Sequence, residues 1–173
     1  MQPMIKKIEA LAISISVQSG IGTIEAVSEK DDNIKAIFQM TAKTPLMTKD
    51  GHQIGVSAIP VKGKIIAFVD SQSPVPMLSP PRITPLLVVF DQYDKIGEVC
   101  VGAFDQALYC EKLRLKLHIS EATEIVDLTG RRMGREDLAD RMLFVFYDQV
   151  TRSSPAQAKP TKIIATDINY ALV

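Results

Sequence analysis

The stretch LAISISVQSG, residues 11–20, carries the pattern that decides the fold. Its large apolar residues occupy every second position: Leu11, Ile13, Ile15 and Val17. This alternation is typical of a strand with one buried face. The run ends at Gln18-Ser19-Gly20, where glycine supplies the positive φ of a tight reversal. The stretch therefore predicts a strand followed by a turn.

The combination of a short apolar run and a turn recurs along the chain. Further turn signals rich in Gly, Asp or Asn occur at residues 30–33, 49–51, 62–63 and 91–94. Turns at this spacing join neighbouring strands. We therefore expect a mainly β protein, in which an antiparallel meander forms a barrel or a sandwich.

Two runs, residues 65–69 and 86–90, are apolar at every position, which is typical of strands covered on both faces. Such a cover comes from a second layer or from another subunit. Further strands are expected at residues 34–40, 54–58, 96–104, 111–119 and 142–147. One short helix is expected near residues 134–141, because Glu136 and Asp137 suit a helix N-terminus.

Two segments resist assignment to strands or helices. Residues 71–85 form a long Pro-rich loop, in which the prolines remove N–H groups and fix φ. The loop is either a contact arm or an ordinary surface crossover. Residues 153–160 form a spacer before a terminal strand, residues 163–172. That strand either closes its own barrel or adds to the sheet edge of a neighbouring subunit.

The composition limits the classes of protein and partner. The 173 residues predict a single domain over 1–173, and no repeat of fixed period is evident. Lys plus Arg and Asp plus Glu number 20 each, which argues against nucleic acid and membrane surfaces as partners. No apolar stretch reaches the length of a membrane span. The two cysteines are too few for a disulfide framework and favour a reducing compartment: the cytoplasm, or a particle assembled there.

The residues that most often do chemistry are few. His52 and His118 lie in no zinc-binding spacing, and neither has an evident catalytic partner. Cys100 and Cys110 are symmetric about Asp105, so a hairpin there would place them on neighbouring strands. Apolar packing is favoured over a redox pair, because free cysteine is usually buried. We therefore assign no catalytic residue, no cofactor and no metal ligand.

One loop has the chemistry of an anion site. Three arginines, Arg131, Arg132 and Arg135, surround Gly130 and Gly134, so that guanidinium and backbone N–H groups would hold an anion. The alternative is that these arginines pair with acids of a neighbouring strand or subunit. The spacing of Arg131 and Arg135 resembles the RxxxR half of a PilZ-type cyclic-dinucleotide site, whose companion D/N-x-S-x-x-G pattern is missing downstream.

The pattern as a whole favours a non-enzymatic structural subunit that forms a homo-oligomer or docks into a larger particle. Components of phage tails and injection apparatus are similar at the level of fold alone. The alternatives are a regulatory domain that binds a ligand at the arginine loop, or a small enzyme with an unrecognised site. The expected assembly contacts lie in the Pro-rich loop and the terminal strand: Pro74, Pro76, Met77, Pro80, Pro81, Ile163, Ile164, Ile168 and Tyr170.

Overall fold

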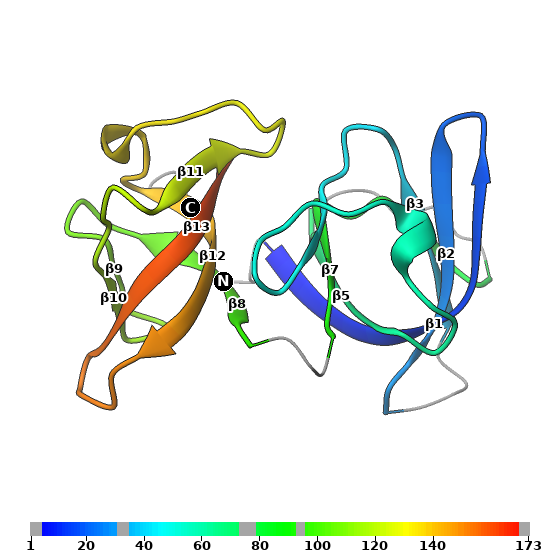
Figure 1. The fold of residues 1–173 in the computed structure, drawn as a ribbon, viewed down its shortest axis with the longest axis horizontal. Helices are drawn as coiled ribbons and strands as arrows, with labels where there is room; N and C mark the ends of the chain where they lie inside the picture. The colour runs from blue at the N-terminus through cyan, green and yellow to red at the C-terminus, as the bar shows by residue number, and fades with distance from the viewer. Residues whose placement is uncertain (1–4, 31–34, 73–78, 93–95, 170–173) are drawn as a thin grey trace. The chain divides into compact units, whose positions relative to one another are not determined.

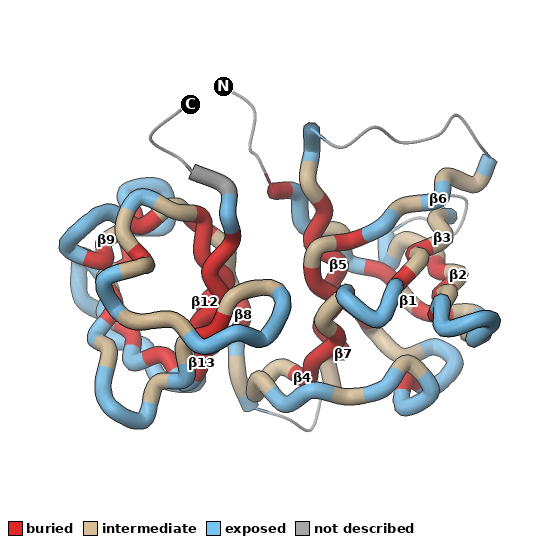
Figure 2. The backbone as a smooth tube through the Cα atoms, turned by 90° about the horizontal axis from the view of Figure 1, so that it is seen from above, coloured by how far each residue is buried: buried red, intermediate tan, exposed pale blue. Residues whose placement is uncertain are grey.

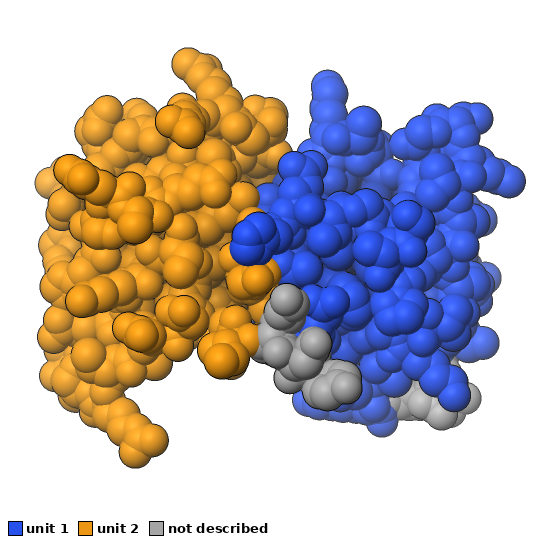
Figure 3. Space-filling view, viewed as in Figure 1, with its two compact units in different colours: residues 1–48, 52–94 blue, residues 49–51, 95–173 orange. Residues whose placement is uncertain are grey.

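The computed structural model describes residues 5–30, 35–72, 79–92 and 96–169, with side chains up to residue 167. The chain divides into two compact units, coloured separately in Figure 3. Unit 1 comprises residues 1–48 and 52–94, and unit 2 comprises residues 49–51 and 95–173. The expectation that residues 1–173 fold as a single domain stays a prediction.

The protein is mainly β, as predicted, and its strands form two sheets (Figure 1). Unit 1 contains β1 (Ile5–Gln18), β2 (Ile21–Ser28), β3 (Lys35–Met40), β4 (Leu46–Thr48), the 3₁₀ turn η1 (Val56–Ala58), β5 (Lys64–Asp70), β6 (Arg82–Ile83) and β7 (Leu87–Phe90). Unit 2 contains β8 (Glu98–Phe104), β9 (Tyr109–Cys110), β10 (Leu115–Leu117), β11 (Glu124–Asp127), the 3₁₀ turn η2 (Arg135–Asp137), β12 (Arg141–Val150) and β13 (Ala156–Asn169). The described residues contain no helix longer than these two 3₁₀ turns, and neither turn could cross a membrane.

Three expected elements differ from the structure. The strand expected at residues 111–119 is reduced to β10, Leu115–Leu117, because residues 111–114 form a turn. The strand expected at residues 54–58 is the single turn η1, preceded by Ile54, whose N–H donates to Leu46 O at 3.0 Å. The helix expected near residues 134–141 is the single turn η2, because Asp140 has a positive φ of 59° that ends any helix there. Acidic residues mark the start of this turn correctly, but they do not determine its length.

The sheet of unit 1 has the order β4-β7-β5-β1-β2-β3-β6. Strands β1, β2 and β3 form the expected antiparallel meander, whereas β4 and β6 pair in parallel with β7 and β3. The long β1 pairs with β5 over residues 5–11 and with β2 over residues 10–18, with a register shift between Ala12 and Ser14 in the pairing with β2. Only three residues separate β6 from β7, although they lie near opposite ends of the sheet, so the sheet must curl.

The core of unit 1 lies inside this curl. It contains Ala10, Ala12, Ile24, Phe38, Ile65, Ala67, Val88 and Phe90, among others. The alternate residues of β5, Ile66 and Phe68, are buried as well, and all four residues of β7 are buried (Figure 2). The prediction that residues 65–69 and 86–90 are covered on both faces is thus confirmed.

The sheet of unit 2 depends on the terminal strand. The first part of β13 pairs in parallel with β10, and its second part lies between the antiparallel β12 and the parallel β11. The core contains Phe104, Leu117, Leu138, Leu143, Val145, Ile163 and Ala165, among others. Of the two arrangements expected for the terminal strand, closure of its own sheet is the one observed.

Both irregular segments contain more strand than expected. Within residues 71–85, Arg82–Ile83 form β6, and residues 73–78 lie outside the described part. Strand β13 begins at Ala156, inside the expected spacer 153–160, because the Ala156 N–H donates to Arg114 O at 3.1 Å. Pro160 is tolerated in β13 because it lies opposite Tyr147, where the register shifts.

The two units repeat one arrangement of strands. In unit 1, the short strand β4 pairs in parallel with β7, which also pairs in antiparallel with β5. In unit 2, β11 pairs in parallel with β13, which also pairs in antiparallel with β12. The parallel pairs are Leu46–Val88 and Met47–Val89 in unit 1, and Ile125–Ile163 and Val126–Ile164 in unit 2. The antiparallel pairs are Ile65–Phe90 and Ile66–Val89 in unit 1, and Leu143–Ala165 and Phe144–Ile164 in unit 2.

The correspondence extends to single bridges and turns. The isolated bridge Met47–Gln53 of unit 1 has its counterpart in Val126–Arg132 of unit 2. The glycines of the two turns, Gly51 and Gly130, have φ of 86° and 88°. Both turns lead into a 3₁₀ turn preceded by an extended glycine. The structure therefore contains an internal repeat that the sequence pattern alone did not indicate.

If the units are repeats of one fold, corresponding core residues should contribute similarly to stability. Phe38 and Leu117 occupy corresponding positions and are 0 % and 1 % exposed. Phe38→Ala and Leu117→Ala should each lower the free energy of unfolding by about 2–5 kcal/mol, measured by urea denaturation. The exposed Val61→Ala is the control. A decrease in the free energy of unfolding below about 0.5 kcal/mol for either variant would contradict the assignment of Phe38 and Leu117 to corresponding core positions.

Candidate functional site

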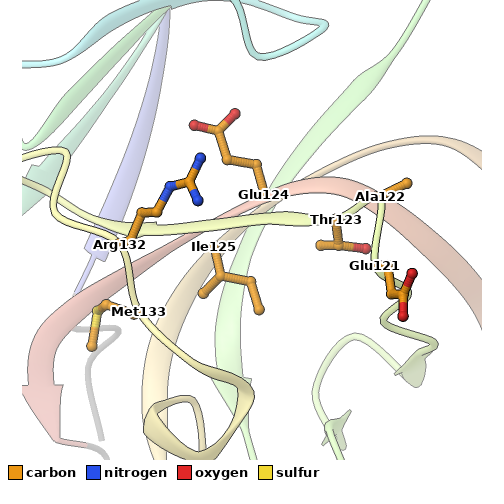
Figure 4. A pocket seen from close by; sticks show the side chains of 7 residues that line it. All are labelled: Glu121, Ala122, Thr123, Glu124, Ile125, Arg132 and Met133. Carbon is orange, nitrogen blue, oxygen red and sulfur yellow. The ribbon is translucent and has the colours of Figure 1, made fainter.

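A pocket of about 410 Å³ opens beside β11 in unit 2 (Figure 4). It is lined by Glu121, Ala122, Thr123, Glu124, Ile125, Arg132 and Met133. Side chains of one wall come from β11 and the turn before it, and those of the other wall from the segment between β11 and η2. The pocket is thus built from two stretches that are close in sequence.

Hydrogen bonds hold both walls in place. In the turn before β11, the Ser120 N–H donates to Thr123 Oγ1 at 3.2 Å, and the Thr123 hydroxyl donates to Pro160 O on β13 at 2.8 Å. On the opposite wall, the Met133 N–H donates to Ile125 O at 3.0 Å. These backbone and threonine hydroxyl hydrogen bonds hold the two segments that carry the exposed charged side chains.

The charges of the pocket are of both signs. Glu124 lies 3.6 Å from Lys162 Nζ, and the Lys162 side chain is only 11 % exposed. Glu121 and Arg132 are exposed, and within the described part of the chain neither side chain forms an ion pair or a hydrogen bond. One positive and one negative group are therefore available to a ligand.

The turn from Asp127 to Arg131 is organised by one carboxylate. Asp127 Oδ1 accepts hydrogen bonds from Thr129 Oγ1 at 2.6 Å, from the Thr129 N–H at 2.8 Å and from the Arg131 N–H at 3.0 Å. The Thr129 hydroxyl first, and then the two backbone N–H groups and the Arg131 charge, lower the pKa of Asp127 against the opposing effect of burial. Asp127 thus stays ionised and stabilises the turn.

Backbone donors of the arginine loop are already engaged. Besides the Arg131 N–H, the Gly134 N–H donates to Asp137 Oδ2 at 2.9 Å, and the Gly130 N–H donates to Asp127 O at 3.1 Å. The predicted anion site relied on such N–H groups together with the arginine side chains. These three N–H groups are therefore occupied within the loop itself and are not available to an anion.

The structure separates the three predicted arginines. Arg132 lines the pocket beside β11, whereas Arg135 lines a second pocket of about 310 Å³ with Gln106, Leu108, Glu136 and Ala139. Arg131 lies in the turn organised by Asp127. Arg132 and Arg135 therefore do not share one pocket.

The residues expected to make assembly contacts fall into three groups. Ile163 and Ile164 are fully buried in the chain itself, so no surface contact is available to them. Pro80 and Pro81 are half-buried, and the Pro81 carbonyl accepts from the Ile37 N–H at 2.9 Å. The other five lie outside the described residues or side chains: Pro74, Pro76, Met77 and Tyr170, and the side chain of Ile168.

The histidines and cysteines are dispersed. His118 Nε2 shares a hydrogen bond of 2.6 Å with Gln157 Oε1 at the surface, and His52 is exposed. Cys110 is buried in the core of unit 2 with Cys100 packed at its margin, and both are free thiols. Across the described ranges, no three His, Cys, Asp or Glu side chains are placed to hold a metal ion.

Sequence reasoning missed Glu121 and Glu124, because nothing in their local pattern marks them as pocket residues. A signal was present in the spacing of Thr, Gly and Gly, which is the same at Thr44, Gly51 and Gly55 as at Thr123, Gly130 and Gly134. This shared spacing brings the sequences of the two repeats into register, so that each segment lining the pocket can be matched to a segment of unit 1. Comparison of the chain with protein-family models, with curated proteins and with solved structures finds no match.

The role of Asp127 can be tested by titration. Thr129→Val should raise the Asp127 pKa toward its ordinary value, because the hydroxyl is the main group that lowers it. The stabilisation by ionised Asp127 is present above the pKa of the unfolded chain, about 4, and is lost as the pH falls through the folded pKa. Carboxyl-detected NMR measures the pKa, with Thr151→Val as the control. An unchanged Asp127 pKa in Thr129→Val would contradict this account.

Proposed function

We propose that the chain is a non-enzymatic assembly protein, which binds further copies of itself or other proteins through loops and hairpins carried on two repeated β units. The observation that carries the proposal is that the two units share their strand pairing while their surfaces differ. Repetition of a scaffold with altered loops is typical of proteins that function by contact.

The surfaces available for contact differ between the units. Unit 1 carries a long β1–β2 hairpin, whose tip exposes Val17 and Ile21 at 58 % and 44 %. The corresponding strands of unit 2 are shorter, because β8 has 7 residues and β9 only 2, and their connection closes where the Asp105 N–H donates to Tyr109 O at 3.0 Å. Apolar side chains held in solvent at a rigid hairpin tip favour association with another protein surface.

The particle to which such a subunit belongs is inferred only from analogy. Phage tails and injection apparatus contain subunits of comparable size and β content, so a component of such a particle fits the proposal. An assembly in the cytoplasm agrees with the two free thiols.

A second candidate function is ligand binding in unit 2. It is favoured by the charged pocket beside β11, where Arg132 and Glu121 stand without partners among the residues described. The two functions are compatible, because the pocket and the β1–β2 hairpin lie on different units.

The assembly proposal is tested by the solution mass of the full chain. Light scattering over a range of protein concentrations and salt should give a mass above the 19.0 kDa of a monomer. The double variant Val17→Ser with Ile21→Ser should weaken association by about tenfold or more, since each exposed apolar side chain contributes about 1 kcal/mol or more on burial. Leu113→Ser, another exposed apolar residue, is the control.

A strictly monomeric chain at all concentrations would contradict self-assembly. If the full chain associates and the hairpin variant associates equally well, assembly stands and the hairpin is not its contact.

A further inference from the structure

The pocket beside β11 presents opposite charges at its two ends. In Figure 4, Arg132 and Glu121 stand at opposite ends of the row of lining side chains, with Ile125 and Thr123 between them. Both charged side chains are exposed, and Ile125 and Met133 are half-buried. A complementary ligand therefore has a negative group and a positive group separated by an apolar chain.

The third charged side chain of the pocket does not disturb this pattern. Glu124 is paired with Lys162 on β13, at 3.6 Å. The Lys162 charge offsets the repulsion that Glu124 would exert on a ligand carboxylate next to Arg132. The available charges are thus one guanidinium and one carboxylate.

The fold itself does not require these charges, because unit 1 builds the same structure without them. The corresponding turn of unit 1 has the same hydrogen bonds: the Thr41 N–H donates to Thr44 Oγ1 at 3.2 Å, as the Ser120 N–H does to Thr123 Oγ1. The positions of Glu121, Glu124 and Arg132 correspond there to Ala42, Pro45 and Gln53. At one position the charged residue is in unit 1 instead, where Lys43 corresponds to Ala122.

We propose that this pocket binds a basic amino-acid residue with a free α-carboxylate, either arginine or lysine itself or the C-terminal residue of a peptide. The Arg132 guanidinium binds the α-carboxylate, for which its planar fork is suited. The Glu121 carboxylate accepts the cationic head of the side chain, and the methylenes between the two charged ends contact Ile125, which lies between Arg132 and Glu121 (Figure 4). This inference rests on the second candidate function, ligand binding in unit 2.

Size and exposure agree with such a ligand. A volume of about 410 Å³ lies at the lower end of the range for small-molecule sites, which holds a single amino-acid residue with its solvent. Because both end groups are exposed, salt should weaken binding, and the affinity should be low. Titration followed by NMR is suited to weak binding of this kind.

The test titrates the ¹⁵N-labelled full chain with four probes. L-arginine and the peptide Ala-Ala-Arg with a free carboxylate should both shift the amide signals of residues 121–125 and 132–133. L-citrulline, which lacks the side-chain charge, and amidated Ala-Ala-Arg, which lacks the carboxylate, should bind at least tenfold more weakly. Binding of free arginine alone identifies a free amino acid as the ligand, and binding of the peptide identifies a C-terminal residue; either result supports the shared chemistry.

Variants of single charges complete the test. Arg132→Gln copies Gln53 of unit 1, so it should fold normally and bind L-arginine about tenfold more weakly. Glu121→Gln should have a similar effect. Arg152→Gln, an exposed arginine outside the pocket, is the matched control and should bind as the native chain does.

Three results would overturn the proposal: no shift of the pocket amides with either arginine probe, equal binding of the amidated peptide, or equal binding by Arg132→Gln. None of them bears on self-assembly, which is measured separately by the solution mass. Failure of this proposal is therefore distinguishable from failure of the assembly proposal.

Discussion

The structure depends on the pairing of the last strand in each unit. Strand β7 lies between β5 and β4, and β13 lies between β12 and β11, so the backbone groups on both edges of these strands are bonded within the chain. Unpaired N–H and C=O groups in a buried position would cost free energy, and this pairing satisfies them where the side chains are fully buried. The short strands β4 and β11 each pair in parallel with the last strand of their unit and are also bridged to the segment that follows them, at Gln53 and Arg132.

Comparison of the two units distinguishes residues that the shared fold requires from residues that it does not require. Both copies keep the threonine that closes the turn before the short strand, and both keep a glycine of positive φ, Gly51 or Gly130. The charges beside β11, by contrast, belong to unit 2 alone. Residues that differ between copies of one scaffold mark the places where binding can be specialised, and for this reason both proposals concern loops and tips.

The sequence predicts much of the fold, because alternating and fully apolar runs report burial directly. The strands at β1, β3, β5, β7, β8 and β12 are all visible in this way. Beyond the shared spacing of Thr, Gly and Gly, the repeat is not visible in the sequence, because the separation between corresponding residues shortens along the chain: Met47 corresponds to Val126, but Val88 to Ile163. The pocket was missed because it forms where the segment after β11 folds back onto that strand, with the Met133 N–H bonded to Ile125 O, and nothing in the local sequence pattern marks this contact.

Strand β13 closes the sheet of its own chain and not that of a neighbour. Hydrogen exchange followed by mass spectrometry, at two widely different protein concentrations, tests it most directly. The amides of residues 162–165 are expected to exchange as slowly as those of β12, with equal protection at both concentrations. Fast exchange of these amides, or protection that is lost on dilution, would contradict it.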